Sequence, residues 1–196
     1  MTLVKAIAPS QSLAVKAAMV ILGSAFIAIA AQISVPMLPV PMTLQTLAIL
    51  IVGLSYGARL GSLTVAAYLA EGAAGLPVFA NFHNGVAFTG PTAGFLVGFL
   101  LLAFVAGLAA DRGARGVVAM AVAGLVASAL LYIPGVVWPM VLAEGVGIDA
   151  SQWGADSLAM VWQYYVGPFL IGDAVKAVIA ALVVAGGWAA LKGRKV

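Results

Sequence analysis

The chain has 196 residues, of which 64% are hydrophobic and only 8% are charged, and its mean hydropathy is +1.17. So few polar side chains cannot cover a water-soluble globule of this length, and the composition therefore predicts an integral membrane protein. The net charge of +3 comes from basic residues that form no patch, which argues against nucleic-acid binding, and the absence of cysteine excludes disulfides and thiolate metal sites.

Apolar runs predict six transmembrane helices in one all-α domain that covers residues 1–196. A bilayer core of about 30 Å requires roughly 20 apolar residues in a helix. In chain order, the six runs are approximately 14–35, 40–56, 59–74, 91–110, 116–133 and 167–191. The second and third are short for a full crossing, so we expect their ends to rest on neighbouring helices or on thinned lipid.

The basic residues fall on one side of the membrane if the N-terminus is cytoplasmic. That side then carries Lys5, Lys16, Arg59, Arg112, Arg115, Lys192, Arg194 and Lys195. The opposite loops carry Glu71, Glu144, Asp149 and Asp156, without Lys or Arg. This asymmetry follows the positive-inside rule and predicts that both termini are cytoplasmic. The exception is Lys176, which lies inside the last run.

The first apolar run has a competing interpretation as a signal peptide. Lys5 and Lys16 precede its apolar core, and Ala28-Ile29-Ala30 resembles a cleavage site. The run continues to Val35, however, and its removal would leave an odd number of spans. We therefore interpret it as a transmembrane helix.

The same run carries two small residues, Ala14 and Ala18, one helical turn apart near its cytoplasmic end. Comparable spacings occur at Gly57 and Gly61 and at Gly90, Gly94 and Gly98. In lipid, such faces let helix backbones approach closely. Most serve packing inside a bundle, and for Ala14 and Ala18 the docking of a partner protein is the alternative.

Three segments on the outer side differ from ordinary loops. Residues 35–46 alternate prolines with apolar residues, which predicts an extended apolar cover with Pro41 near the first turn of the next helix. Residues 72–91 place Phe79 among glycines and prolines in a loop able to fold back, so Phe79 is a pocket candidate. Residues 134–166 carry five Trp and Tyr side chains, which we interpret as an interfacial belt.

Asp173 and Lys176 stand three residues apart in the last run, a spacing that puts both side chains on one face of a helix. They can pair with each other or converge on a third polar group. A charge at membrane depth costs roughly 2.5–3.5 kcal/mol on insertion scales, and such charges usually mark a ligand or ion pathway. In the predicted topology both lie in the outer half of the membrane.

Four motifs spread over almost the whole chain resemble those of one family. They are Val40-Pro41-Met42-Thr43-Leu44-Gln45-Thr46-Leu47, Tyr68-Leu69-x-x-Gly72-x-x-Gly75-Leu76-Pro77-Val78-Phe79-Ala80, Gly90-Pro91-Thr92-Ala93-Gly94-Phe95-Leu96-x-Gly98-Phe99 and Pro168-Phe169-x-x-Gly172-Asp173-x-x-Lys176. In this order they are similar to the BioY family, the biotin-capturing S components of energy-coupling-factor transporters.

The resemblance implies a six-helix fold with a biotin pocket near the outer face, closed by the connecting loops. It also implies a transport subunit without catalytic activity or cofactor, in the cytoplasmic membrane of a bacterium or archaeon. The implied partners are a transmembrane coupling protein and two ATP-hydrolysing subunits. By the motifs, the predicted substrate-binding residues include Asp173, Lys176, Gln45, Phe79 and Tyr68.

An Asn from the loop before the fourth helix belongs to the same family pattern, and its position here maps to Asn84. Where the family is commonly Gly-rich, this chain reads Asn81-Phe82-His83-Asn84-Gly85. Either Asn81 or Asn84 is therefore the residue that faces the ligand. His83, a lone histidine in an outer loop, is left outside the predicted site.

These residues suit the chemistry of biotin. Its ureido ring offers two N–H donors and one carbonyl, which an ionised Asp173 and an Asn amide can match without unpaired groups. Lys176 would neutralise Asp173, bond to the ureido oxygen or meet the carboxylate tail. The alternative is a purely structural ion pair, because pairing is how a membrane interior usually tolerates charge.

The absence of several sequence motifs argues against other functional classes. The chain has no Gly-x-x-x-x-Gly-Lys-Ser/Thr, so it cannot bind ATP in the P-loop manner and has to borrow energy. An intramembrane enzyme would need chemistry of the His-Glu-x-x-His or Gly-x-Ser-x-Gly kind, and neither motif occurs. A proton-coupled carrier that uses Asp173 as its relay stays open, although no internal repeat is visible.

Overall fold

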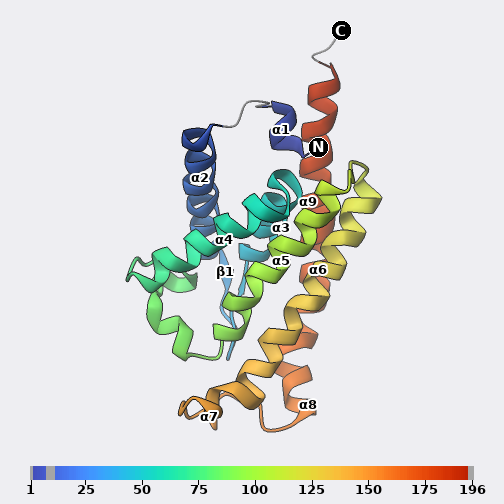
Figure 1. Ribbon diagram of the computed structural model, residues 1–196. Helices are drawn as coiled ribbons and strands as arrows, with labels where there is room; N and C mark the ends of the chain where they lie inside the picture. Colours follow the sequence, from blue (N-terminus) through green and yellow to red (C-terminus); the bar gives the residue numbers. More distant parts are fainter. Residues whose placement is uncertain (1, 8–11, 194–196) are drawn as a thin grey trace.

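Helices dominate residues 2–7 and 12–193, the part of the chain that the computed structural model describes (Figure 1). The long helices are α2 (Leu13–Gln32), α3 (Gln45–Tyr56), α4 (Ala58–Ala73), α5 (Ala93–Asp111), α6 (Val117–Val137) and α9 (Gly167–Gly193). The shorter ones are α1 (Leu3–Ile7), η1 (Ala80–Phe82), η2 (Gly85–Thr89), η3 (Trp138–Leu142), α7 (Ala143–Gly145), α8 (Leu158–Val161) and η4 (Trp162–Val166). Strands β1 (Ser34–Val35) and β2 (Met42–Thr43) form one antiparallel pair.

Each of the six predicted runs contains a long helix. Among the described residues, four helical stretches are long and apolar enough to cross a membrane: Leu13–Gln32, Ala93–Asp111, Val117–Gly145 and Leu158–Leu191. Helix α3 has 12 residues and α4 has 16, fewer than the roughly 20 that a crossing requires. The predicted helical membrane fold is thus confirmed, and the two helices expected to be short are short.

Three predicted helix boundaries were wrong, namely the start at residue 40, the end at residue 133 and the start of the last helical stretch at residue 167. The run 40–56 becomes helical only at Gln45, because Met42 and Thr43 pair with β1, and Pro41 therefore precedes a strand. The predicted loop 134–166 is helical at both ends, through α6, η3 and α7 and again through α8 and η4. Pro134 has no N–H and cannot donate to the carbonyl one turn earlier. Its own carbonyl still accepts from Trp138 N–H, and the helix continues past the proline.

Helix α5 lies in the middle of the bundle and contacts α3, α4 and α6. Gly94 and Gly98 face α6, and a Cβ on either would overlap Pro134 or Leu131. Gly61 likewise faces the backbone of Gly53 on α3. These small-residue faces serve internal packing, as the sequence predicts for most of them.

One end of the bundle is held by contacts between helix turns. The Asp111 carboxylate accepts a hydrogen bond of 2.9 Å from the Ala58 N–H and so caps α4. The preceding turn requires Gly57, which has φ +86° and no room for a Cβ beside Asp111. The Arg115 guanidinium lies 4.5 Å from the ring centroid of Trp188. This end carries α1 and the end of α9, and the opposite end carries α7 and α8 (Figure 1).

The basic residues of the predicted cytoplasmic side follow this division where they are described. Arg59 is the second residue of α4, directly after the α3–α4 turn, and Arg112 and Arg115 stand in the α5–α6 turn. Arg194 and Lys195 lie outside the described residues.

Candidate ligand-binding site

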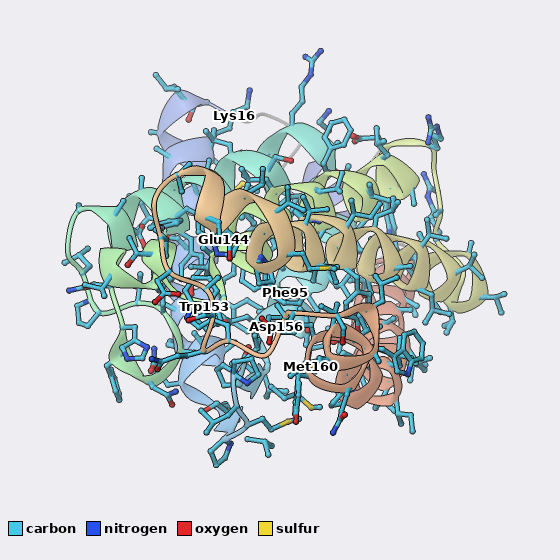
Figure 2. All side chains as sticks on the ribbon, turned by 90° about the horizontal axis from the view of Figure 1, so that it is seen from below. Lys16, Phe95, Glu144, Trp153, Asp156 and Met160 are labelled. Carbon is cyan, nitrogen blue, oxygen red and sulfur yellow. The ribbon has the colours of Figure 1, made fainter. Side chains whose placement is uncertain are left out.

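A cavity of about 740 Å³ lies between helices α3, α5, α6 and α9 and the segments 36–43 and 79–92. Its volume is within the range of roughly 300–1,000 Å³ that is typical of small-molecule sites. Most of its wall is apolar, and Phe95, Phe99, Leu131 and Phe169 contribute to it. Figure 2, seen from the end that carries α7 and α8, places Phe95 near the centre of the bundle.

The polar side chains of the wall differ in burial. Gln45, Thr46, Asp173 and Lys176 are each less than 10% exposed, with values of 4%, 9%, 6% and 7%. Asn81 and His83 also line the cavity but are exposed. The cavity therefore has a buried polar end and an exposed polar rim, with apolar surface in its remaining wall.

Asp173 is the centre of the buried polar end. Its Oδ1 accepts hydrogen bonds from Thr46 Oγ1 at 3.2 Å and from Lys176 Nζ at 3.1 Å. Its Oδ2 accepts a hydrogen bond of 2.7 Å from Tyr132 Oη. A buried carboxylate is tolerated only when it is paired and hydrogen-bonded, as it is here from α3, α6 and α9. Of the two arrangements that the three-residue spacing allows, the structure contains the Asp173–Lys176 ion pair.

Some hydrogen-bonding capacity remains at this end. A carboxylate oxygen accepts about two hydrogen bonds, and an ammonium donates three. The described contacts fill Oδ1 of Asp173 and leave one place on Oδ2, while they engage one of the three donors of Lys176. By this count the Asp173–Lys176 pair alone has capacity to accept one further hydrogen bond and to donate two.

Gln45 belongs to a second network, beside the first. Thr43 Oγ1 donates to Gln45 Oε1 at 2.9 Å, and Gln45 Nε2 donates to Tyr68 Oη at 2.7 Å. Tyr68 Oη in turn donates to the Val78 carbonyl at 3.0 Å. Gln45 lines the cavity, whereas Tyr68 is fully buried and lies outside the lining. Tyr68 therefore links Gln45 to the segment after α4 by hydrogen bonds, and it supports the cavity wall without lining the cavity.

Phe79 lines the cavity and is 2% exposed. Its ring meets Tyr68 and Phe88 edge to face, with centroids 5.3 and 5.4 Å away. The ring also lies against Gly72, where any Cβ would overlap it. The loop after α4 thus folds back onto that helix, as the sequence predicts.

The two candidate asparagines have different surroundings. Asn84 caps η2, since its Oδ1 accepts from Val86 N–H at 3.3 Å, and it lies outside the cavity lining. Asn81 lines the cavity, and Ser34 Oγ donates to its Oδ1 at 3.3 Å. Of the two asparagines, Asn81 is thus the one that lines the cavity. His83, left out by the sequence analysis, also lines the cavity.

The predicted docking residues lie far from the cavity along α2. Ala14 and Ala18 are both exposed, in contrast to the glycine faces of α4 and α5. Thr46 and Tyr132, which donate to Asp173 in the cavity wall, were not among the predicted site residues. Thr46 stands in the same motif as Gln45, and Tyr132 lies near the end of an apolar run, outside the four motifs. Within residues 2–7 and 12–193, no three His, Asp or Glu side chains gather as a metal site would require.

Residues 5–193 match the family model of the BioY family. The biotin transporter BioY of Thermotoga maritima is 36% identical over 163 residues, which is 82% of this chain and 88% of that protein. The biotin transporter BioY of Rhodobacter capsulatus is 39% identical over 165 residues, covering 76% of this chain and 81% of that one.

A solved structure shares the fold. It is the crystal structure at 2.1 Å of the S-component for biotin from an ECF-type ABC transporter, with a TM-score of 0.68 and 23% sequence identity. The match covers 95% of this chain and 96% of that one. Family model, relatives and fold agree with the four motifs and with the helical membrane architecture. The chain belongs to the BioY family.

Proposed function

We propose that this chain binds biotin at the outer face of the cytoplasmic membrane and is the substrate-capture subunit of an energy-coupling-factor transporter. The chain is a multi-pass membrane protein of the BioY family, and its relatives are named biotin transporters. The observation that carries the proposal is the buried carboxylate of Asp173, held by Thr46, Tyr132 and Lys176 in the cavity wall.

The hydrogen-bonding capacity of the cavity matches the ureido ring of biotin. One ring N–H donates to the open place on Asp173 Oδ2, and the ring carbonyl accepts from Lys176. The rim residue Asn81 serves the second N–H, and the apolar wall receives the sulfur ring and the alkyl chain. A buried donor or acceptor without a partner costs about 1–3 kcal/mol, so a ligand without these groups binds less well.

The proposed topology has six crossings, with α3 and α4 as the two short ones. The α3–α4 turn with Arg59 and the α5–α6 turn with Arg112 lie at the same end as α1 and the end of α9 (Figure 1). By the positive-inside rule this end is cytoplasmic. Asp173 and Lys176 then lie in the outer half of the membrane, within the first turns of α9.

The proposed partners are a transmembrane coupling protein and two ATP-binding-cassette subunits, which hydrolyse ATP in place of this chain. The exposed small face of Ala14 and Ala18 at the cytoplasmic end of α2 is the proposed docking site for the coupling protein. Small side chains allow a partner helix to approach the backbone closely.

Biotin uptake into vesicles tests this function. The chain is reconstituted alone and with the coupling module, each with and without internal ATP and an imposed proton gradient. We expect ATP-dependent accumulation only when the module is present. Accumulation by the chain alone, driven by the proton gradient, would favour the proton-coupled carrier. Titration of the purified chain with biotin separates binding from energy coupling.

A further inference from the structure

Gln32, the last residue of α2, uses its whole side-chain amide in hydrogen bonds to the backbone. Nε2 donates to the Phe79 carbonyl at 3.1 Å and to the Ala28 carbonyl at 3.2 Å, and Oε1 accepts from Phe82 N–H at 3.0 Å. An amide has two N–H donors and one oxygen acceptor, so donors and acceptor are all engaged. Two of the three bonds reach a segment 47 to 50 residues further along the chain.

These two bonds bracket a tight turn. Asn81 lies between the two bonded residues, Phe79 and Phe82. Asn81 and Phe82 have φ values of 55° and 57°. Within the described residues, they are the two non-glycine positions with positive φ. The left-handed conformation costs roughly 1–2 kcal/mol for an L-residue, so contacts from outside the turn are needed to hold it. Gln32 supplies one such contact on each side of Asn81.

The turn is also part of the cavity wall. Phe79, Asn81 and His83 line the cavity, whereas Gln32 does not. The turn follows α4 in the chain, yet it is fastened to α2 and to the residues just after it, because Ser34 Oγ also donates to Asn81 Oδ1. The end of α2 therefore helps to hold this wall, in addition to the contacts of Phe79 with α4.

We propose that Gln32 is a positioning residue for the ligand. It fixes the turn 79–83 in the shape that presents Phe79 and Asn81 to the bound molecule, without contact to that molecule. The identity of the ligand as biotin rests on the proposed function. The role of Gln32 in the turn alone is supported by its hydrogen bonds and does not depend on the identity of the ligand.

The test compares three variants of the purified full chain. Gln32→Leu removes both long-range bonds with little change in size. Gln32→Glu keeps an oxygen that can accept from Phe82 N–H, but it replaces the amide N–H donor that faces the Phe79 carbonyl with a carboxylate oxygen. Ser24→Ala is the matched control, because Ser24 lies on the same helix and donates to Glu71 Oε1 at 2.7 Å, away from the cavity. Each protein is titrated with biotin and followed by hydrogen exchange.

We expect Gln32→Leu to weaken biotin binding by about 10- to 100-fold, as two hydrogen bonds of ordinary strength predict. Gln32→Glu should also weaken binding, because a carboxylate oxygen cannot donate to the Phe79 carbonyl, whereas Ser24→Ala should change the affinity by no more than about twofold. Without biotin, Gln32→Leu should raise amide exchange in residues 79–85 and leave α9 unchanged. Such confined exchange reports local opening of the turn, which a general loss of stability would not produce.

Wild-type affinity in folded Gln32→Leu protein would overturn the inference. Equal losses in Gln32→Leu and Ser24→Ala, with exchange raised throughout the chain, would also overturn it. If Gln32→Leu does not fold, Gln32→Glu decides by the same readouts. A wild-type chain that does not bind biotin would remove the proposed function, and the exchange of residues 79–85 would then decide the role of Gln32 alone.

Discussion

Tyr132 on α6 donates a hydrogen bond of 2.7 Å to Oδ2 of Asp173 on α9. The contact joins two helices at the buried end of the cavity, and both residues line it. One place for a donor remains on the same oxygen. Tyr132 therefore sets the direction from which a ligand N–H can approach Asp173.

Replacement of Tyr132 with Phe should weaken biotin binding by about 10- to 100-fold, because a hydrogen bond to a charged group contributes about 1.5–3 kcal/mol. Isothermal titration of the purified protein measures the change. Tyr56→Phe is the matched control, since Tyr56 Oη donates to the Met19 carbonyl at 3.3 Å and lies outside the cavity lining. Equal affinities of Tyr132→Phe and wild type would contradict the role of Tyr132.

The two asparagines should separate into a ligand contact and a structural cap. Asn81→Gly removes a side chain from the cavity rim but allows the left-handed backbone, so biotin affinity should fall with little loss of thermal stability. Asn84→Ala removes the cap of η2, so the free energy of unfolding should fall by roughly 0.5–2 kcal/mol while the affinity for biotin is retained. The reverse pattern would return the ligand contact to Asn84.

Local sequence spacing was enough to predict part of the site. Asp173 and Lys176 pair within one helical turn, and charged residues inside an apolar run are visible without a structure. Thr46 and Tyr132, however, lie 127 and 41 residues from Asp173 along the chain. Such contacts depend on how α3, α6 and α9 pack, and hydrophobic periodicity contains no information about that packing.

The end of α6 and the turn at Asn81 also could not be predicted from local sequence. Pro134 resembles a helix end in the sequence, yet it lies inside α6, and Trp138 N–H donates to its carbonyl. By position the family motif pointed to Asn84, with Asn81 as the alternative, whereas it is Asn81 that lines the cavity in the structure. The short α3 and α4 could be predicted because run length is local.

The proposed topology predicts opposite accessibility for two loops. Single cysteines at Arg112 and at Ser151, in a chain without native cysteine, should react with an impermeant thiol reagent from opposite sides of the membrane. Arg112 stands in the basic α5–α6 turn, and Ser151 in the segment between α7 and α8. Labelling of both from one side would refute the orientation proposed for Asp173 and Lys176.

The docking proposal predicts that energy coupling and binding can be separated. Ala14→Trp with Ala18→Trp should prevent co-purification with the coupling module and ATP-driven uptake, because two indoles would keep helix backbones apart. Biotin binding should be retained, since both residues lie at the other end of α2 from the cavity. Co-purification at wild-type yield would exclude this face as the docking site.

The central claim is that the ionised carboxylate of Asp173 binds biotin, and titration of purified Asp173→Asn protein with biotin tests it most directly. The substitution removes the charged acceptor and leaves Lys176 buried without its partner. Removal of one partner of a buried pair costs about 3–5 kcal/mol, which corresponds to roughly two to four decades in affinity if all of it falls on the bound state. Asp156→Asn, which removes an exposed acid of the outer segment, is the control and should bind as wild type does. The account predicts this loss in folded, membrane-inserted Asp173→Asn protein, and wild-type affinity in that protein would contradict it.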